Sequence, residues 1–269
     1  MKHALIAFLK QVNAMPFRFS MKHYQVFGSA TEALKDQELN SAQSWDALRE
    51  THPFFSISEN RDEWLAASEL AVAKDGQDTA LAARADEVVA LIQRKGFDRV
   101  FSTGVGGAAL EYQIKKKMPQ LPVVCSDYSA ETVRRLQKVF TESDGVIEFD
   151  ILKGDWKAVE RQYLGTNGLC IMYRLDAGFS DDQWHIIFDV MQEAGVTNVL
   201  VIPTGTLTML SIYNRKKREL LWALKHIPVV FSGYLRTKHR FISHWDEWYD
   251  TEEATFGGLK GFLLKKRAR

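Results

Sequence analysis

The feature that most constrains the fold of this sequence is a short apolar segment that runs into three closely spaced glycines. Residues 97–110 read FDRVFSTGVGGAAL, with Gly104, Gly106 and Gly107 between the apolar segment and small, helix-forming residues. This pattern predicts a buried strand that turns sharply through the glycines into a helix. Such a turn presents backbone N–H groups and the positive end of a helix dipole, which suit a phosphate, a carboxylate or a polar cofactor edge. The same spacing also occurs in turns that only connect a strand to a helix, so both interpretations stay open.

The next two predicted strands each end in a carboxylate. Residues 121–126 form an apolar run that Asp127 follows, and residues 145–149 are followed by Asp150. Asp127 lies roughly twenty residues beyond the glycines, where an acid can accept hydrogen bonds from both hydroxyls of a ribose. Parallel strands with polar residues at their carboxyl ends predict a nucleoside pocket at one edge of an open sheet.

Composition limits the class of protein. The 269 residues, 46% of them hydrophobic, are enough for one α/β domain with a smaller cap. A formal net charge of +1 gives no basic field for nucleic acid or an anionic membrane, and the basic clusters at 215–218 and 265–267 are short. We therefore expect a small-molecule substrate rather than nucleic acid.

The remaining composition signals concern compartment and metal. Cys125 and Cys170 fall in predicted buried strands and are interpreted as core residues in a reducing compartment. No apolar run approaches the ~18 residues of a membrane span, and the run at 4–9 is too short for a signal peptide. We expect a soluble, cytoplasmic protein. The seven histidines are scattered and no Cys-x-x-Cys occurs, so no metal site is predicted.

The order of predicted elements divides the chain after residue 78. Residues 1–78 are rich in aromatics and are predicted to form a helical cap, with short helices at 44–50 and 59–74. The cap either packs on the main sheet or forms a lid over a substrate, with Phe54, Phe55 and Trp64 among its walls. From 79 to 269 strands and helices alternate. Strands are predicted at 98–103, 121–126, 145–150, 168–174 and 196–202, and helices at 79–95, 107–118, 130–140, 155–163, 181–194 and 207–224.

The end of the chain does not continue the alternation of strands and helices. Strands are predicted at 229–237 and 258–266, and no helix fits between them. Two strands joined without a crossover helix are expected to pair antiparallel.

Residues 80–269 resemble a class I S-adenosylmethionine-dependent methyltransferase. The resemblance rests on the glycine turn at 102–107, on Asp127 and Asp150, and on the antiparallel finish. It implies an α/β fold with a Rossmann-like, seven-stranded, mostly parallel sheet in the order 3-2-1-4-5-7-6, the last strand antiparallel and helices on both faces. It also implies a methyltransferase that uses S-adenosylmethionine as cofactor and acts on a small-molecule acceptor.

The resemblance assigns residues to the cofactor. Thr103, Gly104 and Gly106 are expected against its methionine and ribose portion, and Asp127 on the ribose hydroxyls. The adenine is expected beside Tyr128, with its amino group bound by Asp150 and a backbone or apolar contact from Ile151. One departure is Ser102, which stands where the family usually has an acidic residue that helps to hold the methionine amino group.

The acceptor side is less defined. The resemblance places Tyr173 and Arg174, which end the fourth strand, near the methyl group. Methyl transfer needs alignment, desolvation and, for some acceptors, a base. His239 and His244 are candidate bases in a polar, aromatic segment, and a structural role for each is the competing interpretation.

Two other classes of function stay open. Gly104-x-Gly106-x-x-Ala109 with Asp127 also fits the dinucleotide fingerprint of an NAD(P)-dependent oxidoreductase. The two strands that are expected to pair antiparallel at the end of the chain, and the segment ahead of the first strand, fit a methyltransferase better than an oxidoreductase. A non-catalytic, methyltransferase-like partner protein is the third interpretation, supported mainly by Ser102.

Overall fold

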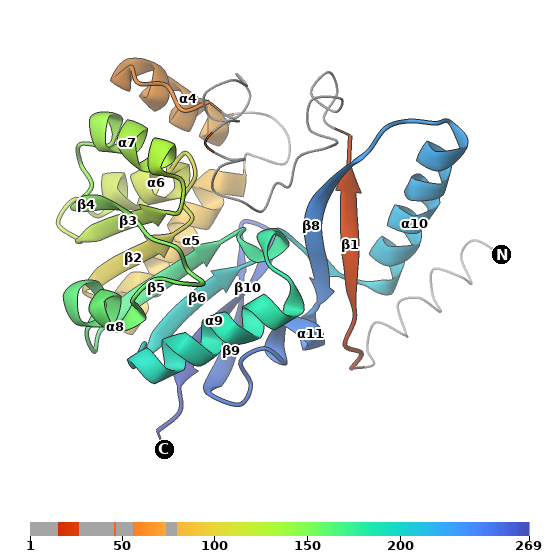
Figure 1. Cartoon of the computed structure of the whole chain (residues 1–269). Coiled ribbons are helices and arrows are strands. Elements are labelled where there is room, and N and C mark those ends of the chain that lie inside the picture. Colours follow the sequence, from red (N-terminus) through yellow and green to blue (C-terminus); the bar gives the residue numbers. More distant parts are fainter. Residues whose placement is uncertain (1–15, 27–45, 47–55, 74–79, 269) are drawn as a thin grey trace.

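The computed structural model describes residues 16–26, 46, 56–73 and 80–268. Its centre is a seven-stranded sheet in the order β4-β3-β2-β5-β6-β10-β9 (Figure 1). The strands are β2 (Arg99–Thr103), β3 (Val123–Asp127), β4 (Gly145–Glu148), β5 (Gly168–Tyr173), β6 (Asn198–Ile202), β9 (Tyr249–Phe256) and β10 (Leu259–Lys266). Numbered along the chain from β2, this order is 3-2-1-4-5-7-6, as expected. The strand β10 runs antiparallel to both of its neighbours, β6 and β9, and the other pairs are parallel.

The sixth strand of this sheet is not the segment that the sequence predicted. The predicted strand at 229–237 exists as β8 (Val230–Thr237), but it belongs to a separate three-stranded sheet. Its place in the central sheet is taken by β9, which pairs with β10 through a tight hairpin. β9 is an edge strand on which most residues are exposed or half-buried. Its sequence, YDTEEATF, therefore carries little of the apolar signal by which buried strands are recognised.

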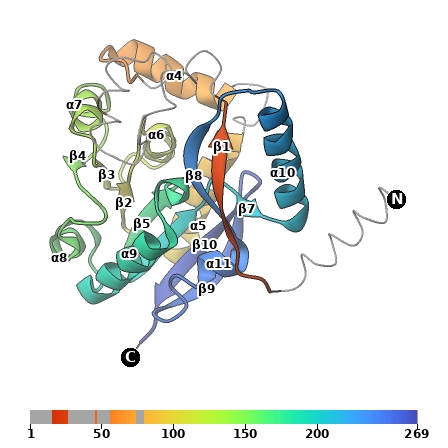
Figure 2. The ribbon, with the colours of Figure 1, turned by 45° about the vertical axis from the view of Figure 1, so that its right-hand side comes forward.

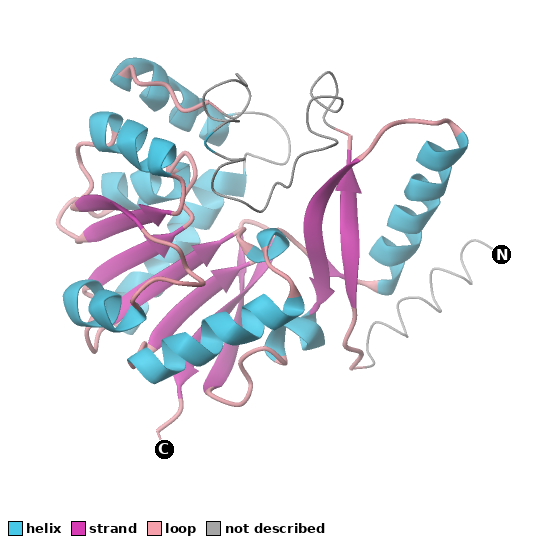
Figure 3. Cartoon of the chain, viewed as in Figure 1, coloured by secondary structure: helices cyan, strands magenta, loops and turns pink. Residues whose placement is uncertain are grey.

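Helices cover both faces of the central sheet, as expected (Figure 3). One face carries α4 (Arg61–Ala73), α5 (Ala80–Lys95), α6 (Ala109–Lys117) and α7 (Ala130–Val139); the other carries α8 (Trp156–Val159), α9 (Asp181–Ala194) and α11 (Lys238–Ile242). Successive strand residues serve opposite cores, since Val100 packs on the first face and Phe101 on the second. Cys125 and Cys170 are both buried and unpaired in these cores.

The second sheet stands beside the central one. It joins β1 (Ser20–Gln25), β8 and β7 (Thr206–Leu207). Figures 1 and 2 show α10 (Met209–Leu224) packed alongside it, where Ile212 meets a small apolar cluster of Met21, Leu207 and Leu235. β8 also packs against the short helix η3 (Asp176–Gly178), which follows β5. The second sheet therefore lies near the carboxyl end of β5.

The region ahead of the central sheet is only partly helical. The helix predicted at 59–74 is confirmed as α4, whereas residues 20–25 form the strand β1, which the predicted helical cap did not include. Most of the helix predicted at 44–50 lies outside the described residues, as do Phe54 and Phe55. The domain boundary after residue 78 stays a prediction. Among the helices that the structure describes, none is sufficiently long and apolar to cross a membrane.

Candidate functional site

The glycine turn follows β2 and adopts left-handed backbone angles. Gly104 and Gly106 have φ values of 60° and 53°, and Ala108, the N-cap residue just before α6, has φ 55°. L-residues with a Cβ avoid this region, so glycine is favoured at both positions. A Cβ on Gly104 would lie 2.2 Å from Cδ2 of Leu175, in the loop after β5. The close approach at Gly104 is thus made by a side chain of the protein, where a ligand was expected.

Asp127 is tied directly to this turn. Its carboxylate accepts hydrogen bonds from the backbone N–H of Gly106 (Oδ2, 3.0 Å) and of Ser129 (Oδ1, 3.0 Å). The side chain ends β3, and the residue is 6% exposed. The structure therefore brings the glycines and the acid of the next strand into one constellation, as the sequence pattern predicted.

The other cofactor candidates follow on the same edge. The half-buried Tyr128 comes directly after Asp127, whose carbonyl accepts a hydrogen bond from Phe149 N–H (2.9 Å) and so joins the loop after β4 to the loop after β3. In that loop the Asp150 carboxylate accepts from Leu152 N–H (2.9 Å). The Ile151 side chain is buried in the core, and its backbone carbonyl accepts a hydrogen bond from Nε1 of Trp156 (3.0 Å).

Glu111, on α6, brings a carboxyl group next to Ser102, which stands where the methyltransferase family usually has an acidic residue. Ser102 donates a hydrogen bond from Oγ to Oε1 of Glu111 (2.6 Å), and both residues are buried. Burial raises the pKa of Glu111 to about 7, and the bond from Ser102 only partly opposes this. Sequence reasoning missed Glu111, because α6 also carries Lys115, Lys116 and Lys117 and a charged residue on such a helix gives no local sign of burial.

Tyr173 lies beside the glycine turn. Thr103 pairs with Met172, so Gly104 and Tyr173 leave the sheet next to each other. The phenol oxygen of Tyr173 accepts a hydrogen bond from Nη1 of Arg84 on α5 (3.0 Å). Arg174 is exposed and has φ 57°, an angle that costs a non-glycine residue about 1 kcal/mol or more and often marks a functional site.

The candidate histidines lie elsewhere. His244 is buried, with Nε2 3.2 Å from Oδ1 of Asp181, a carboxylate that also binds Arg236 and Arg240. Burial and the charge of Arg236 lower the pKa of His244 to about 4. His239 is half-buried on α11. No contact among the described residues joins either histidine to the glycine turn or to Asp127, and their catalytic role stays a prediction.

Two described residues ahead of residue 79, Asp46 and Trp64, contact the segments next to Asp127 and the glycine turn. Oδ1 of Asp46 accepts hydrogen bonds from Ser129 Oγ (2.5 Å) and Glu131 N–H (3.3 Å), at the start of α7 and close to Asp127. Trp64 packs between α6 and α7 and donates from Nε1 to the carbonyl of Gly107 (3.0 Å). Trp64 is thus a buried core residue that supports the glycine turn, and the lid hypothesis stays a prediction.

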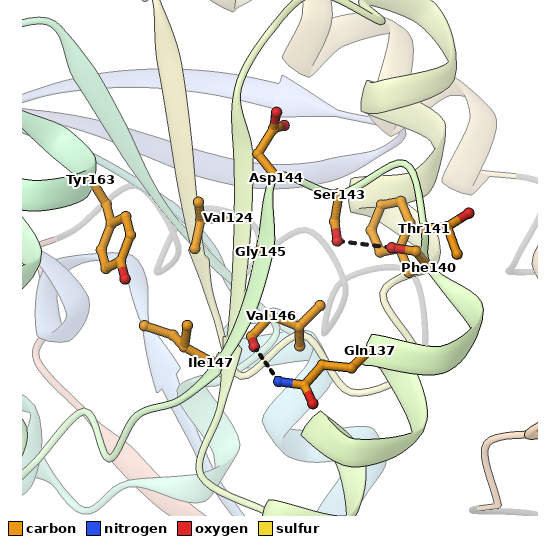
Figure 4. Close-up of a pocket in the computed structure, with 10 residues that line it drawn as sticks. All are labelled: Val124, Gln137, Phe140, Thr141, Ser143, Asp144, Gly145, Val146, Ile147 and Tyr163. Atoms are coloured by element: carbon orange, nitrogen blue, oxygen red, sulfur yellow. Dashed lines mark hydrogen bonds between the residues drawn. The ribbon is translucent and has the colours of Figure 1, made fainter.

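A groove of about 620 Å³ lies away from this constellation (Figure 4). Its lining includes Gln137, Phe140, Asp144, Gly145 and Tyr163. Gly145 begins β4, so the groove opens at the amino end of that strand. Ligands of open parallel sheets bind at the carboxyl ends, and the groove is therefore not the predicted site.

No family model and no curated protein matches the chain. Among solved structures, human N-acetylserotonin methyltransferase in complex with SAM matches with a TM-score of 0.53 and 15% identity, over 100% of this chain and 84% of that one. A putative O-methyltransferase from Nostoc punctiforme gives 0.51 and 14%, over 98% and 84%. Magnesium protoporphyrin IX methyltransferase from Synechocystis with bound SAH gives 0.50 and 14%, over 77% and 98%. The chain therefore has the fold of the class I S-adenosylmethionine-dependent methyltransferases.

Proposed function

We propose that this protein is an S-adenosylmethionine-dependent methyltransferase that acts on a small-molecule acceptor. The observation that carries the proposal is the hydrogen bond from Gly106 N–H to the Asp127 carboxylate. It fixes a left-handed glycine turn against an acid at the carboxyl edge of a parallel sheet, where such folds bind nucleoside ligands. The solved methyltransferase structures with the same fold support this assignment.

The cofactor would lie along the ends of β2, β3 and β4. In this proposal Asp127 accepts hydrogen bonds from the ribose hydroxyls, and the turn from Thr103 to Gly106 supports the methionine portion. Tyr128 lies beside the adenine. Asp150 accepts from the adenine amino group, and Ile151 contributes its backbone.

The acceptor would lie beyond the end of β5. The methyl group of a sulfonium is already activated, so the protein chiefly aligns the acceptor and excludes water. Tyr173 and Arg174 stand where acceptor and cofactor would meet. For an acceptor that must lose a proton, the low pKa of His244 makes it a weak base, and His239 remains the other candidate.

Two observations bear on the rival functions. The order of the central sheet, with its antiparallel β10, fits the methyltransferase fold rather than the dinucleotide-binding fold of an oxidoreductase. Ser102 was the main support for a non-catalytic protein. Because Glu111 brings a carboxyl group next to Ser102, this part of the site does contain an acid.

Isothermal titration calorimetry with S-adenosylmethionine, S-adenosylhomocysteine and NAD(H) tests the proposal. We expect the first two to bind in the low micromolar range or somewhat more weakly, and NAD(H) to give no heat. Asp127→Ala should weaken binding tenfold or more, because a hydrogen bond to a charged group contributes ~1.5–3 kcal/mol. Asp98→Ala, at an exposed acid that pairs with its neighbour Arg99, is the matched control. Binding of NAD(H) alone would replace the proposal with an oxidoreductase.

A further inference from the structure

Arg84 is a buried cation to which the described chain offers no opposite charge. The residue is 6% exposed and lies in the first half of α5. Its one hydrogen bond goes from Nη1 to the neutral phenol oxygen of Tyr173 (3.0 Å). The Nε atom is buried and has no hydrogen-bond partner. In the described part of the chain no carboxylate forms an ion pair with this guanidinium.

The other buried lysine and arginine side chains among the described residues, Lys115 and Arg236, are neutralised. The buried side chain of Arg236 pairs with Asp181 at 2.6 Å, and that of Lys115 pairs with Asp144 at 2.6 Å. A buried charge without a partner is strongly unfavourable, so a protein retains one where something else supplies the counter-charge. The exception at Arg84 therefore points to a ligand that carries a negative group.

The position of Arg84 indicates which part of the site it serves. Tyr173 is the last residue of β5, and the pairing of Thr103 with Met172 places it next to Gly104. Arg84 reaches Tyr173 from the face of the sheet covered by α5 and α6. Arg84 thus bonds to a residue whose backbone adjoins the glycine turn, on the opposite side of β2 from β4 and Asp150.

We propose that Arg84 and Tyr173 bind a carboxylate, and that it is the carboxylate of the amino-acid end of the cofactor. This inference rests on the proposed function. Tyr173 holds Nη1 and so leaves the edge formed by Nε and Nη2 to face a carboxylate, whose two oxygens match the guanidinium in a bidentate pair. The phenol of Tyr173 accepts from Arg84 and keeps its own proton, which it donates to the same carboxylate.

The first experiment uses the unaltered protein and two ligands. Calorimetry compares S-adenosylhomocysteine with its decarboxylated analogue, S-adenosyl-3-thiopropylamine, which keeps the amino group and lacks only the carboxylate. We expect the decarboxylated compound to bind about tenfold or more weakly, the loss of one charge-assisted pair. Equal affinities overturn the inference but leave the proposed function standing. If neither compound binds, both the inference and the proposed function are wrong.

The second experiment assigns the preference to Arg84. Arg84→Gln should reduce the difference between the two ligands to less than about threefold by weakening S-adenosylhomocysteine alone, and Arg84→Lys should restore part of it. Arg94→Gln is the control, since Arg94 lies on the same helix but is exposed and pairs with Glu252 at 3.8 Å. If Arg84→Gln weakens both ligands equally, Arg84 only positions α5 and Tyr173, and the inference is wrong.

Discussion

The stability of the Glu111→Gln variant, relative to that of the unaltered protein, should increase as the pH rises. Glu111 is 2% exposed, and burial raises its pKa from an ordinary value of 4.5 to about 7. The folded state therefore holds this proton more tightly than the unfolded state does. The stability that the protonated carboxyl contributes is fully present below about pH 4.5 and is lost as the pH rises through 7.

The size of the effect follows from the shift. At ~1.4 kcal/mol per pKa unit, a rise from 4.5 to about 7 means that ionised Glu111 costs ~3 kcal/mol of stability at alkaline pH. Between about pH 5 and 8.5 the cost grows by ~2.5 kcal/mol. Gln cannot ionise, yet its Oε1 still accepts the hydrogen bond from Ser102. A buried amide with an unsatisfied N–H would add a constant penalty of ~1–3 kcal/mol, which does not depend on pH.

Urea unfolding of both proteins across this pH range measures the effect. The stability of Glu111→Gln minus that of the unaltered protein should rise by ~2.5 kcal/mol, or on the order of 5–10 °C in Tm. The subtraction removes the contributions of other titrating groups, such as His23 and His244. Glu193→Gln, at an exposed acid on α9, should show no such trend. A difference between Glu111→Gln and the unaltered protein that does not change with pH would refute the reasoning.

Three further predictions concern the fold and the turn. Since His244 has a pKa of about 4 in the folded state against 6.5 ordinarily, the stability of the protein should fall as the pH drops from about 6.5 toward 4. Urea unfolding of His244→Gln should show a weaker fall. An equally steep fall in both proteins would contradict the lowered pKa of His244. Trp64→Phe should cost about 1 kcal/mol or more through the lost bond to Gly107, as an unfolding midpoint would show. Gly106→Val should still unfold cooperatively but lose S-adenosylhomocysteine binding in calorimetry, because φ 53° excludes a branched side chain; retained affinity would mean that the turn is only a connection.

Much of the central sheet could be predicted because its inner strands are buried on both faces. Such strands are continuous apolar runs, as in β6 (NVLVI), and turn residues bound them. The edge strand β9 (YDTEEATF) is mostly polar, with its buried residues at its two ends, and was missed. β8 has the composition of a strand, but only tertiary contacts decide which sheet it joins.

Some residues of the candidate site could also be predicted from the sequence, and others could not. The glycine turn and Asp127 could be predicted because local spacing along the chain encodes them. Arg84 and Asp46 bond to partners 89 and 83 residues away in the sequence, and Glu111 bonds to Ser102 on the other side of the glycine turn. No local pattern distinguishes such residues from other charged residues on a helix.

A crystal structure of the protein with S-adenosylhomocysteine tests the central claim most directly. The account predicts the ribose hydroxyls within hydrogen-bond distance of the Asp127 carboxylate, and the amino-acid end of the ligand beside Gly104. A ligand bound away from the carboxyl ends of β2 and β3, for example in the groove beside Gly145, would contradict it.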